Sequence, residues 1–171
     1  MLNKYLKVVL ILVSYAVVSA AQADTSTMFK QVVDKPMNAV YPAVYQALED
    51  ARFFVVFEAN IGKNLTRFAD RWGEDYNRSQ LNGIRSMVFC NVWYANAVSN
   101  ADPDMLGLCP LRLSLYEKNG ATTILFARPS VIAAKSKALS TLKEVEAEVI
   151  TAIKRAAKKV QSVSSANKKV K

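Results

Sequence analysis

The sequence predicts an α+β domain: a small, mainly antiparallel sheet with helices packed on it and a long C-terminal helix. Short β-branched and aromatic runs alternate with stretches of helical periodicity along the chain. Asn119-Gly120 joins two apolar runs and is a strong hairpin signal. From about Ser136 or Ser140 to Val160, apolar residues recur every three or four positions, which is typical of one amphipathic helix.

The first half of the chain contains alternating helix and strand patterns. Residues 24–33 are polar and predict a leader segment, although their apolar positions also allow a first strand. Pro42 suits the first turn of a helix that ends near Ala51. The next elements are predicted as a buried strand over Phe53–Phe57, a helix over Leu65–Trp72 and a strand over Ile84–Trp93.

The second half predicts a short helix, a hairpin and the long helix. Residues 94–100 favour a short helix, and residues 111–116 alternate at period two, as a half-exposed strand does. The hairpin partner is predicted over Thr122–Phe126, and Pro129 ends it. Thr141 and Glu144 fit a capping box for the long helix.

The N-terminus has the pattern of an export signal. Lys4 and Lys7 precede an apolar run from Val8 to Ala20, and Ala21-Gln22-Ala23 is a small-x-small cleavage site. We therefore expect a signal peptide over residues 1–23, a single domain over 24–160 and a basic disordered tail over 161–171. The mature protein is expected to be periplasmic or secreted, and an uncleaved N-terminal anchor is the alternative.

The formal net charge of +9 is concentrated in the C-terminal tail. Residues 154–171 hold seven basic side chains, whereas residues 24–153 hold 14 basic and 14 acidic ones. The tail has two main interpretations: a solvated helix end, or a segment that adheres to an anionic envelope surface. We expect no nucleic-acid partner, because export removes the usual target and the neutral body predicts no basic patch.

The chain contains no histidine. This excludes Ser-His and Cys-His nucleophile pairs, histidine metal sites and the commonest general base near neutral pH. None of the five glycines forms part of a phosphate loop or a dinucleotide fingerprint. We therefore predict no catalytic residues, no metal site and no cofactor, and favour a protein that is not an enzyme.

Cys90 and Cys109 are the candidate thiol or disulfide residues. In an oxidising compartment they invite a disulfide, which requires Cα atoms within about 7 Å of each other. An antiparallel return of the chain after Cys90 would bring them close, and a parallel crossover would separate them. Three possibilities stay open: a structural disulfide, two inert buried thiols, or a redox, haem or ligand site.

Residues that follow Cys90 are candidates for ligand binding, namely Asn91, Trp93 and Tyr94. With Trp72 and Tyr76, the last two could form a stacking wall for a sugar or a flat ligand. The alternative is that these aromatic rings cover the core.

The segments Phe89-Cys90-Asn91 and Leu106-Gly107-Leu108-Cys109-Pro110 resemble the domain of unknown function 302 family. The resemblance extends from about Tyr41 to Ile153. It implies a compact single-domain α+β fold of bacterial or archaeal origin that can form a homodimer, and it implies no particular activity. The chain departs from the family pattern at Val92, where proline is common, and in having Cys109 before Pro110.

Three functions are compatible with these patterns. The leading one is a non-catalytic exported domain that binds a small ligand or a protein partner. The second is a thiol-dependent redox or haem-handling protein that uses Cys90 and Cys109. The third is an envelope-adhering protein that uses its lysine-rich C-terminus.

Overall fold

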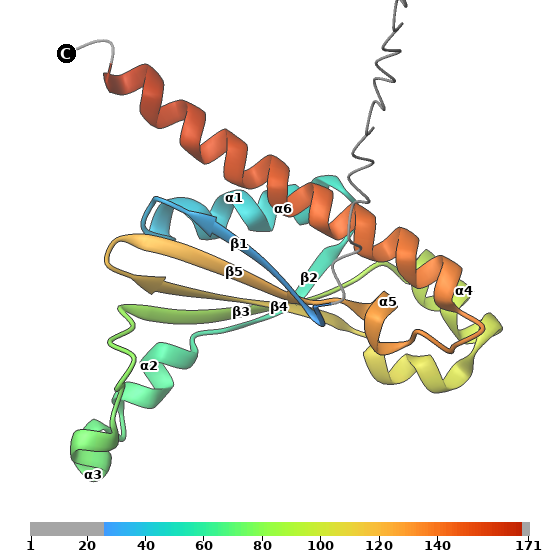
Figure 1. Cartoon of the computed structure of the whole chain (residues 1–171), viewed down its shortest axis with the longest axis horizontal. Coiled ribbons are helices and arrows are strands. Elements are labelled where there is room, and N and C mark those ends of the chain that lie inside the picture. Colours follow the sequence, from blue (N-terminus) through green and yellow to red (C-terminus); the bar gives the residue numbers. More distant parts are fainter. Residues whose placement is uncertain (1–25, 169–171) are drawn as a thin grey trace, which may run out of the picture.

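The protein folds into one antiparallel sheet with the strand order β1-β5-β4-β3-β2 (Figure 1). A computed structural model describes the backbone of residues 26–168 and the side chains of residues 26–162. The strands are β1 Met28–Val33, β2 Phe54–Ala59, β3 Gly83–Cys90, β4 Leu111–Lys118 and β5 Ala121–Ala127. The helices are α1 Met37–Asp50, α2 Ile61–Thr66, α3 Ala69–Trp72, α4 Val92–Ala101, α5 Pro129–Ile132 and α6 Leu139–Lys168, with 3-10 turns η1 Gly73–Asp75 and η2 Pro103–Leu108.

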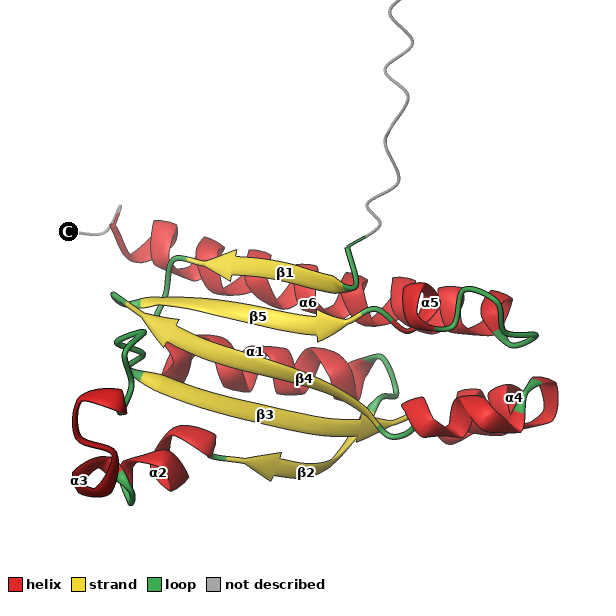
Figure 2. Cartoon of the chain, turned by 60° about the horizontal axis from the view of Figure 1, so that its bottom comes forward, coloured by secondary structure: helices red, strands yellow, loops and turns green. Residues whose placement is uncertain are grey.

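Helices α1 and α6 pack against each other on one face of the sheet (Figures 1 and 2). The core between these layers takes alternate residues of each central strand, as β4 shows by burying Leu113 and Leu115 while Arg112 stays exposed. This arrangement confirms the predicted fold class, including the half-exposed strand and the long C-terminal helix.

The β4–β5 hairpin turns at Asn119-Gly120, as predicted. Lys118 pairs with Ala121, and the two turn residues have φ angles of 52° and 76°. Two successive positive φ values fit a type I′ turn, which the twist of a two-stranded ribbon favours. The possible first strand is also present as β1, which pairs with β5.

Helix α1 begins five residues before Pro42, at Met37, so the predicted start of this helix is wrong. The Met37 N–H donates to the Glu117 carboxylate over 2.7 Å, and Pro36 precedes it as the N-cap. Because the capping carboxylate comes from β4, no local pattern marks the start of the helix. Pro42 lies inside α1.

The strand predicted as buried over Phe53–Phe57 is instead the edge strand β2. Phe53 is fully buried, but Phe54 is 51% exposed and Phe57 is 61% exposed. The register with β3 shifts between Val55 and Phe57, as at a β-bulge. The prediction of a fully buried strand is therefore wrong, because only part of this apolar run faces the core.

Other boundaries differ from the predictions for local reasons. The helix expected over residues 65–72 is two short helices, α2 and α3, that bracket Arg67 and Phe68. Strand β3 ends at Cys90 because Asn91 caps α4. Helix α6 begins at Leu139, which places Thr141 inside it and excludes the predicted capping box.

The long helix continues to Lys168, whereas disorder was predicted from residue 161. Extending a helix that already exists avoids the cost of nucleation, so the modest apolar content of this segment does not end it. The predicted signal peptide and residues 169–171 lie outside the described residues. In the part that is described, no helix combines the length and the apolar character needed to cross a membrane.

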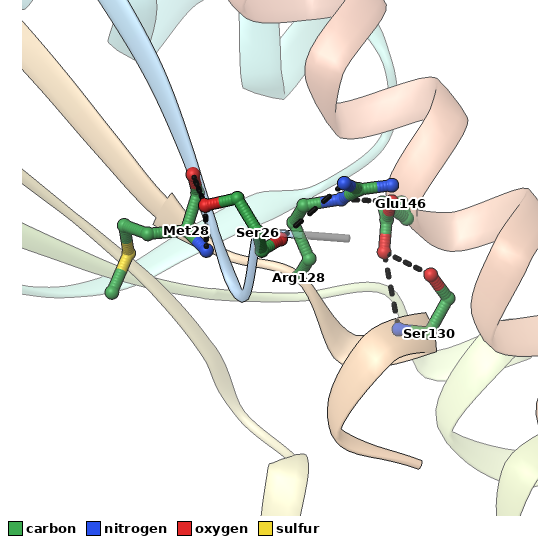
Figure 3. A network of polar contacts seen from close by, with 5 residues as sticks. All are labelled: Ser26, Met28, Arg128, Ser130 and Glu146. Carbon is green, nitrogen blue, oxygen red and sulfur yellow. Dashed lines mark hydrogen bonds and ion pairs between the residues drawn. The ribbon is translucent and has the colours of Figure 1, made fainter. Parts of the chain in front are cut away.

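A buried ion pair ties α6 to the chain just after β5 (Figure 3). Arg128 Nε donates to Glu146 Oε1 over 2.7 Å, and the other carboxylate oxygen accepts from the backbone N–H and the hydroxyl of Ser130. Arg128 also donates to the Ser26 carbonyl over 3.3 Å. The network therefore joins the start of β1, the end of β5 and the N-terminal part of α6.

Candidate functional site

A polar cavity of about 360 Å³ lies where β3 begins and β4 ends. Helix α2 and the loop over residues 76–82 form its other walls. The side chains that matter for its chemistry are Asn60, Lys63, Tyr76, Asn82, Arg85 and Glu117. We refer to it below as the polar cavity.

Gly62 sets how closely α2 approaches the sheet. A Cβ atom added at Gly62 would lie 3.0 Å from the backbone nitrogen of Ile84. Asn60 fixes the start of the same helix, since its side chain accepts a hydrogen bond from the Lys63 N–H over 2.9 Å. The absence of a side chain at Gly62 thus lets α2 lie directly against β3 and form one wall of the polar cavity.

The loop wall is held by side-chain hydrogen bonds. The Asn77 side chain accepts from the Leu81 N–H and donates to the Leu81 carbonyl, both over 2.9 Å. The Tyr76 hydroxyl lies 3.1 Å from the Thr66 hydroxyl of α2. Asn77 and Gln80 have positive φ angles, which asparagine tolerates better than most residues. These contacts give an otherwise irregular segment a defined shape.

Arg85 is the central cation of the polar cavity. Its guanidinium carbon lies 3.6 Å from the centroid of the Tyr41 ring, and one terminal nitrogen lies 3.5 Å from the Glu58 carboxylate. Within the described part of the chain, Arg85 Nε has no hydrogen-bond partner although it is shielded from solvent. A buried donor without a partner costs free energy.

The acidic groups near Arg85 are already engaged. Glu58 accepts a short hydrogen bond from the Tyr41 hydroxyl, and Glu117 accepts from the Met37 N–H. Burial, followed by the hydrogen bond to Glu58, raises the pKa of Tyr41 well above its ordinary value, so this hydroxyl stays a donor. The lining of the polar cavity itself holds two cations, Lys63 and Arg85, and one carboxylate, Glu117.

A second, much smaller cavity contains both cysteines. Its volume is about 20 Å³, and Cys90 and Cys109 line it together with Phe53, Tyr94 and Leu142. Both cysteines are free thiols and partly buried. Burial raises the pKa of the Cys109 thiol, and the nearby Cys90 thiol raises it further. The antiparallel return that would bring the cysteines close is therefore present.

The candidate ligand-binding residues after Cys90 have individual structural contacts. Asn91 caps α4, and its side-chain oxygen accepts from the N–H groups of Trp93 and Tyr94 over 3.0 and 3.2 Å. The Tyr94 ring stacks on Phe53 with centroids 6.0 Å apart. Trp93 is 64% exposed at the surface. These residues lie at the thiol end of β3, away from the polar cavity.

The four aromatic residues proposed for a stacking wall are distributed over separate places. Trp72 stacks on Phe68, Tyr76 lines the polar cavity, and Trp93 contacts Tyr94 edge to face with centroids 4.9 Å apart. No single wall joins them. Tyr94 acts as a lid on the core, which was the alternative interpretation.

Replacing Tyr94 by phenylalanine is expected to make stability less sensitive to alkaline pH. Burial and the 2.8 Å hydrogen bond to Glu148 raise the pKa of Tyr94 to about 12. A raised folded-state pKa contributes stability that is present below the unfolded value of 10.0 and is lost as pH rises toward 12. Chemical denaturation of the wild type and the variant across this pH range measures the effect. The prediction is contradicted if the free energy of unfolding of the two proteins depends on pH in the same way.

The polar cavity is not among the sites predicted from the sequence, although one residue of the sequence points to it. Arg85 interrupts the apolar strand Ile84–Cys90 at a position that shares a face with Met87 and Phe89, both of which are fully buried. An arginine on the core face of a strand needs a partner or a polar site. The residues that complete this site come from α1, β2, α2 and β4, so only the fold brings them together.

Among the described residues, no group of three or more aspartate, glutamate or cysteine side chains is placed to hold a metal ion.

Comparisons with known proteins agree with this fold. The family model "Domain of unknown function DUF302" matches residues 29–160. An uncharacterised conserved DUF302 protein from Bacillus stearothermophilus, solved as a crystal structure, superposes with a TM-score of 0.65 at 20% sequence identity. The match covers 76% of this chain and 98% of that one. No functionally curated protein matches the chain.

Proposed function

The chain belongs to the DUF302 family, and from its own geometry we propose that it is a non-catalytic protein that binds a small organic anion in the polar cavity. The ligand class is a carboxylate or a phosphate monoester with a short apolar body. The observation that carries the proposal is the lining itself, in which two cations, Lys63 and Arg85, lie beside amide and hydroxyl groups, and the Arg85 guanidinium is held against the Tyr41 ring.

The charge of the lining supports an anion rather than a cation. Arg85 is pre-oriented by its stacking on Tyr41, which leaves its planar donor edge fixed. Lys63 supplies a second positive charge from α2. Glu117 already accepts a hydrogen bond from Met37, so its carboxylate is partly neutralised by the start of α1.

The size and the apolar part of the lining support a small organic ligand. A volume of about 360 Å³ lies at the lower end of the range of about 300–1,000 Å³ for ligand pockets. Met37, Leu65 and Leu81 contribute apolar surface. The amides of Asn60 and Asn82 and the hydroxyl of Tyr76 can orient polar groups of the ligand.

Isothermal titration of the full chain with succinate, glycerol phosphate and inorganic phosphate tests the proposal. We expect saturable binding of at least one organic anion and none of succinamide, the neutral counterpart of succinate. Replacing Lys63 by alanine or Arg85 by methionine should weaken binding about tenfold or more, since a charge-assisted hydrogen bond contributes about 1.5–3 kcal/mol.

Arg78→Ala is the matched control for loss of positive charge. Arg78 pairs with Asp75 at the surface, where its side chain is 75% exposed, and it does not line the polar cavity. The variant should bind as the wild type does. Binding that survives both the Lys63 and the Arg85 substitutions, or equal affinity for succinamide, would overturn the proposal.

A pair of glycine substitutions tests the shape of the polar cavity separately from its charge. Gly62→Ala places a Cβ against the Ile84 backbone and should weaken binding by displacing α2. Gly107→Ala adds a methyl group to open space and should leave binding unchanged. Equal affinities of the two variants would show that the position of α2 does not shape the site.

A further inference from the structure

We infer that Cys90 and Cys109 form a reversible dithiol–disulfide pair, which closes when the protein meets a disulfide oxidant such as oxidised glutathione. The pair lies outside the polar cavity and is independent of anion binding. Its effect would be to lock the segment between the two cysteines onto the end of the sheet.

The strand register brings the two cysteines to neighbouring positions. Phe89 of β3 pairs with Leu111 of β4 in an antiparallel ladder. Cys90 is the next residue of β3, and Cys109 lies two residues before Leu111 at the end of η2. Continued by one residue, this register sets Cys90 opposite Pro110, and Cys109 is the residue before it, just outside the ladder. Both cysteines line the same small cavity, which places their side chains near each other.

The small cavity beside the two thiols is too small for an organic ligand. At about 20 Å³, it has room for roughly one water molecule. The surrounding side chains of Phe53, Val98 and Leu142 are buried and apolar. The cavity therefore suits a compact, apolar S–S bridge better than it suits a ligand or two charged thiolates.

Closure would join the two ends of the segment that lies between the cysteines. Residues 91–108 leave the sheet as α4 and η2 and return to it at β4. They pack on α6 through Val98, which contacts the small cluster around Leu142, and Asp102 accepts a hydrogen bond from the Ser136 hydroxyl over 2.6 Å. A bridge between the two ends of this segment would turn it into a closed loop.

The reaction is an ordinary thiol–disulfide exchange. The thiolate of one cysteine attacks a sulfur of oxidised glutathione, which releases one glutathione thiolate and leaves a mixed disulfide. The thiolate of the other cysteine attacks the protein sulfur of that mixed disulfide and releases the second glutathione. The protein loses two protons and two electrons, and the S–S bond of the oxidant is reduced.

Thiol alkylation followed by mass spectrometry tests the inference. Reduced full-length protein is equilibrated with mixtures of reduced and oxidised glutathione. We expect an unalkylated monomer about 2 Da lighter than the reduced protein, with the Cys90 and Cys109 peptides joined. Because the pKa of Cys109 is raised, closure should accelerate as pH increases.

The variants Cys90→Ala and Cys109→Ala provide the controls. Each leaves one thiol, so each should give only a mixed disulfide with glutathione. The inference is overturned if wild-type protein stays reduced, carries glutathione on both cysteines, or forms only intermolecular disulfides under oxidising mixtures.

Hydrogen exchange and thermal unfolding test whether the disulfide restricts the segment between the two cysteines. In the oxidised protein we expect slower exchange across residues 92–108 and unchanged exchange in β1 and β5. Closing a loop of this length should raise the melting temperature by about 5–10 °C. An oxidised protein with the same exchange and melting temperature as the reduced one would refute the locking role.

Discussion

Replacing Glu146 by alanine is expected to lower the free energy of unfolding by about 3–5 kcal/mol, because it leaves the Arg128 guanidinium without its buried partner. The side chains of Arg128 and Glu146 are only 18% and 7% exposed, and the carboxylate accepts from both the N–H and the hydroxyl of Ser130. Urea denaturation at neutral pH measures this loss.

Two variants on the same helix make the Glu146 experiment specific. Glu144→Ala removes an exposed carboxylate two residues away and should change stability by less than about 0.5 kcal/mol. Glu146→Gln keeps the shape and should lie between alanine and wild type, since it retains hydrogen bonds but loses the charge. Equal stabilities of the Glu144 and Glu146 alanine variants would show that the network contributes little.

Phe53→Ala should cost about 3–5 kcal/mol, the range for truncating a fully buried phenylalanine. Its ring contacts Phe89 edge to face and stacks on Tyr94, with centroids 6.0 Å away in each case. The change would leave a cavity between β3 and α4, next to the cysteines. Denaturation curves of purified variants measure the loss directly.

The neighbouring residue provides a stringent control. Phe54→Ala removes the same number of atoms from a side chain that is 51% exposed on the edge strand, so its cost should be about 1 kcal/mol or less. If both variants lost the same stability, Phe54 would be buried in solution, and the edge of the sheet would be covered.

The elements that could be predicted from the sequence are those marked by local chemistry. Asn119-Gly120 specifies its turn because both residues adopt positive φ angles. The apolar residues of α6 recur at the helical period and so predict the helix. The start of α1 could not be predicted, because Glu117, a residue far away in the sequence, caps it. The exposure of β2 depends on strand order, which a run of apolar residues does not encode.

One candidate site could be predicted from the sequence, and the other could not. Cys90 and Cys109 were identified from residue type alone, and the fold places both in one cavity. The polar cavity depends on Arg85, Lys63 and Glu117, which are ordinary surface residue types in isolation. Their significance comes from being brought together at one end of the sheet, and only the tertiary structure provides that information.

The pairing of β1 with β5 determines the order in which the chain can complete its fold during synthesis. Strands β2, β3 and β4 each pair with the next strand along the chain, so a meander can grow as residues emerge. Strand β1 emerges first but must wait for β5, because Met28 pairs with Ala127. The first strand to leave the ribosome is thus the last to join the sheet, and until then its backbone remains available to wrong partners.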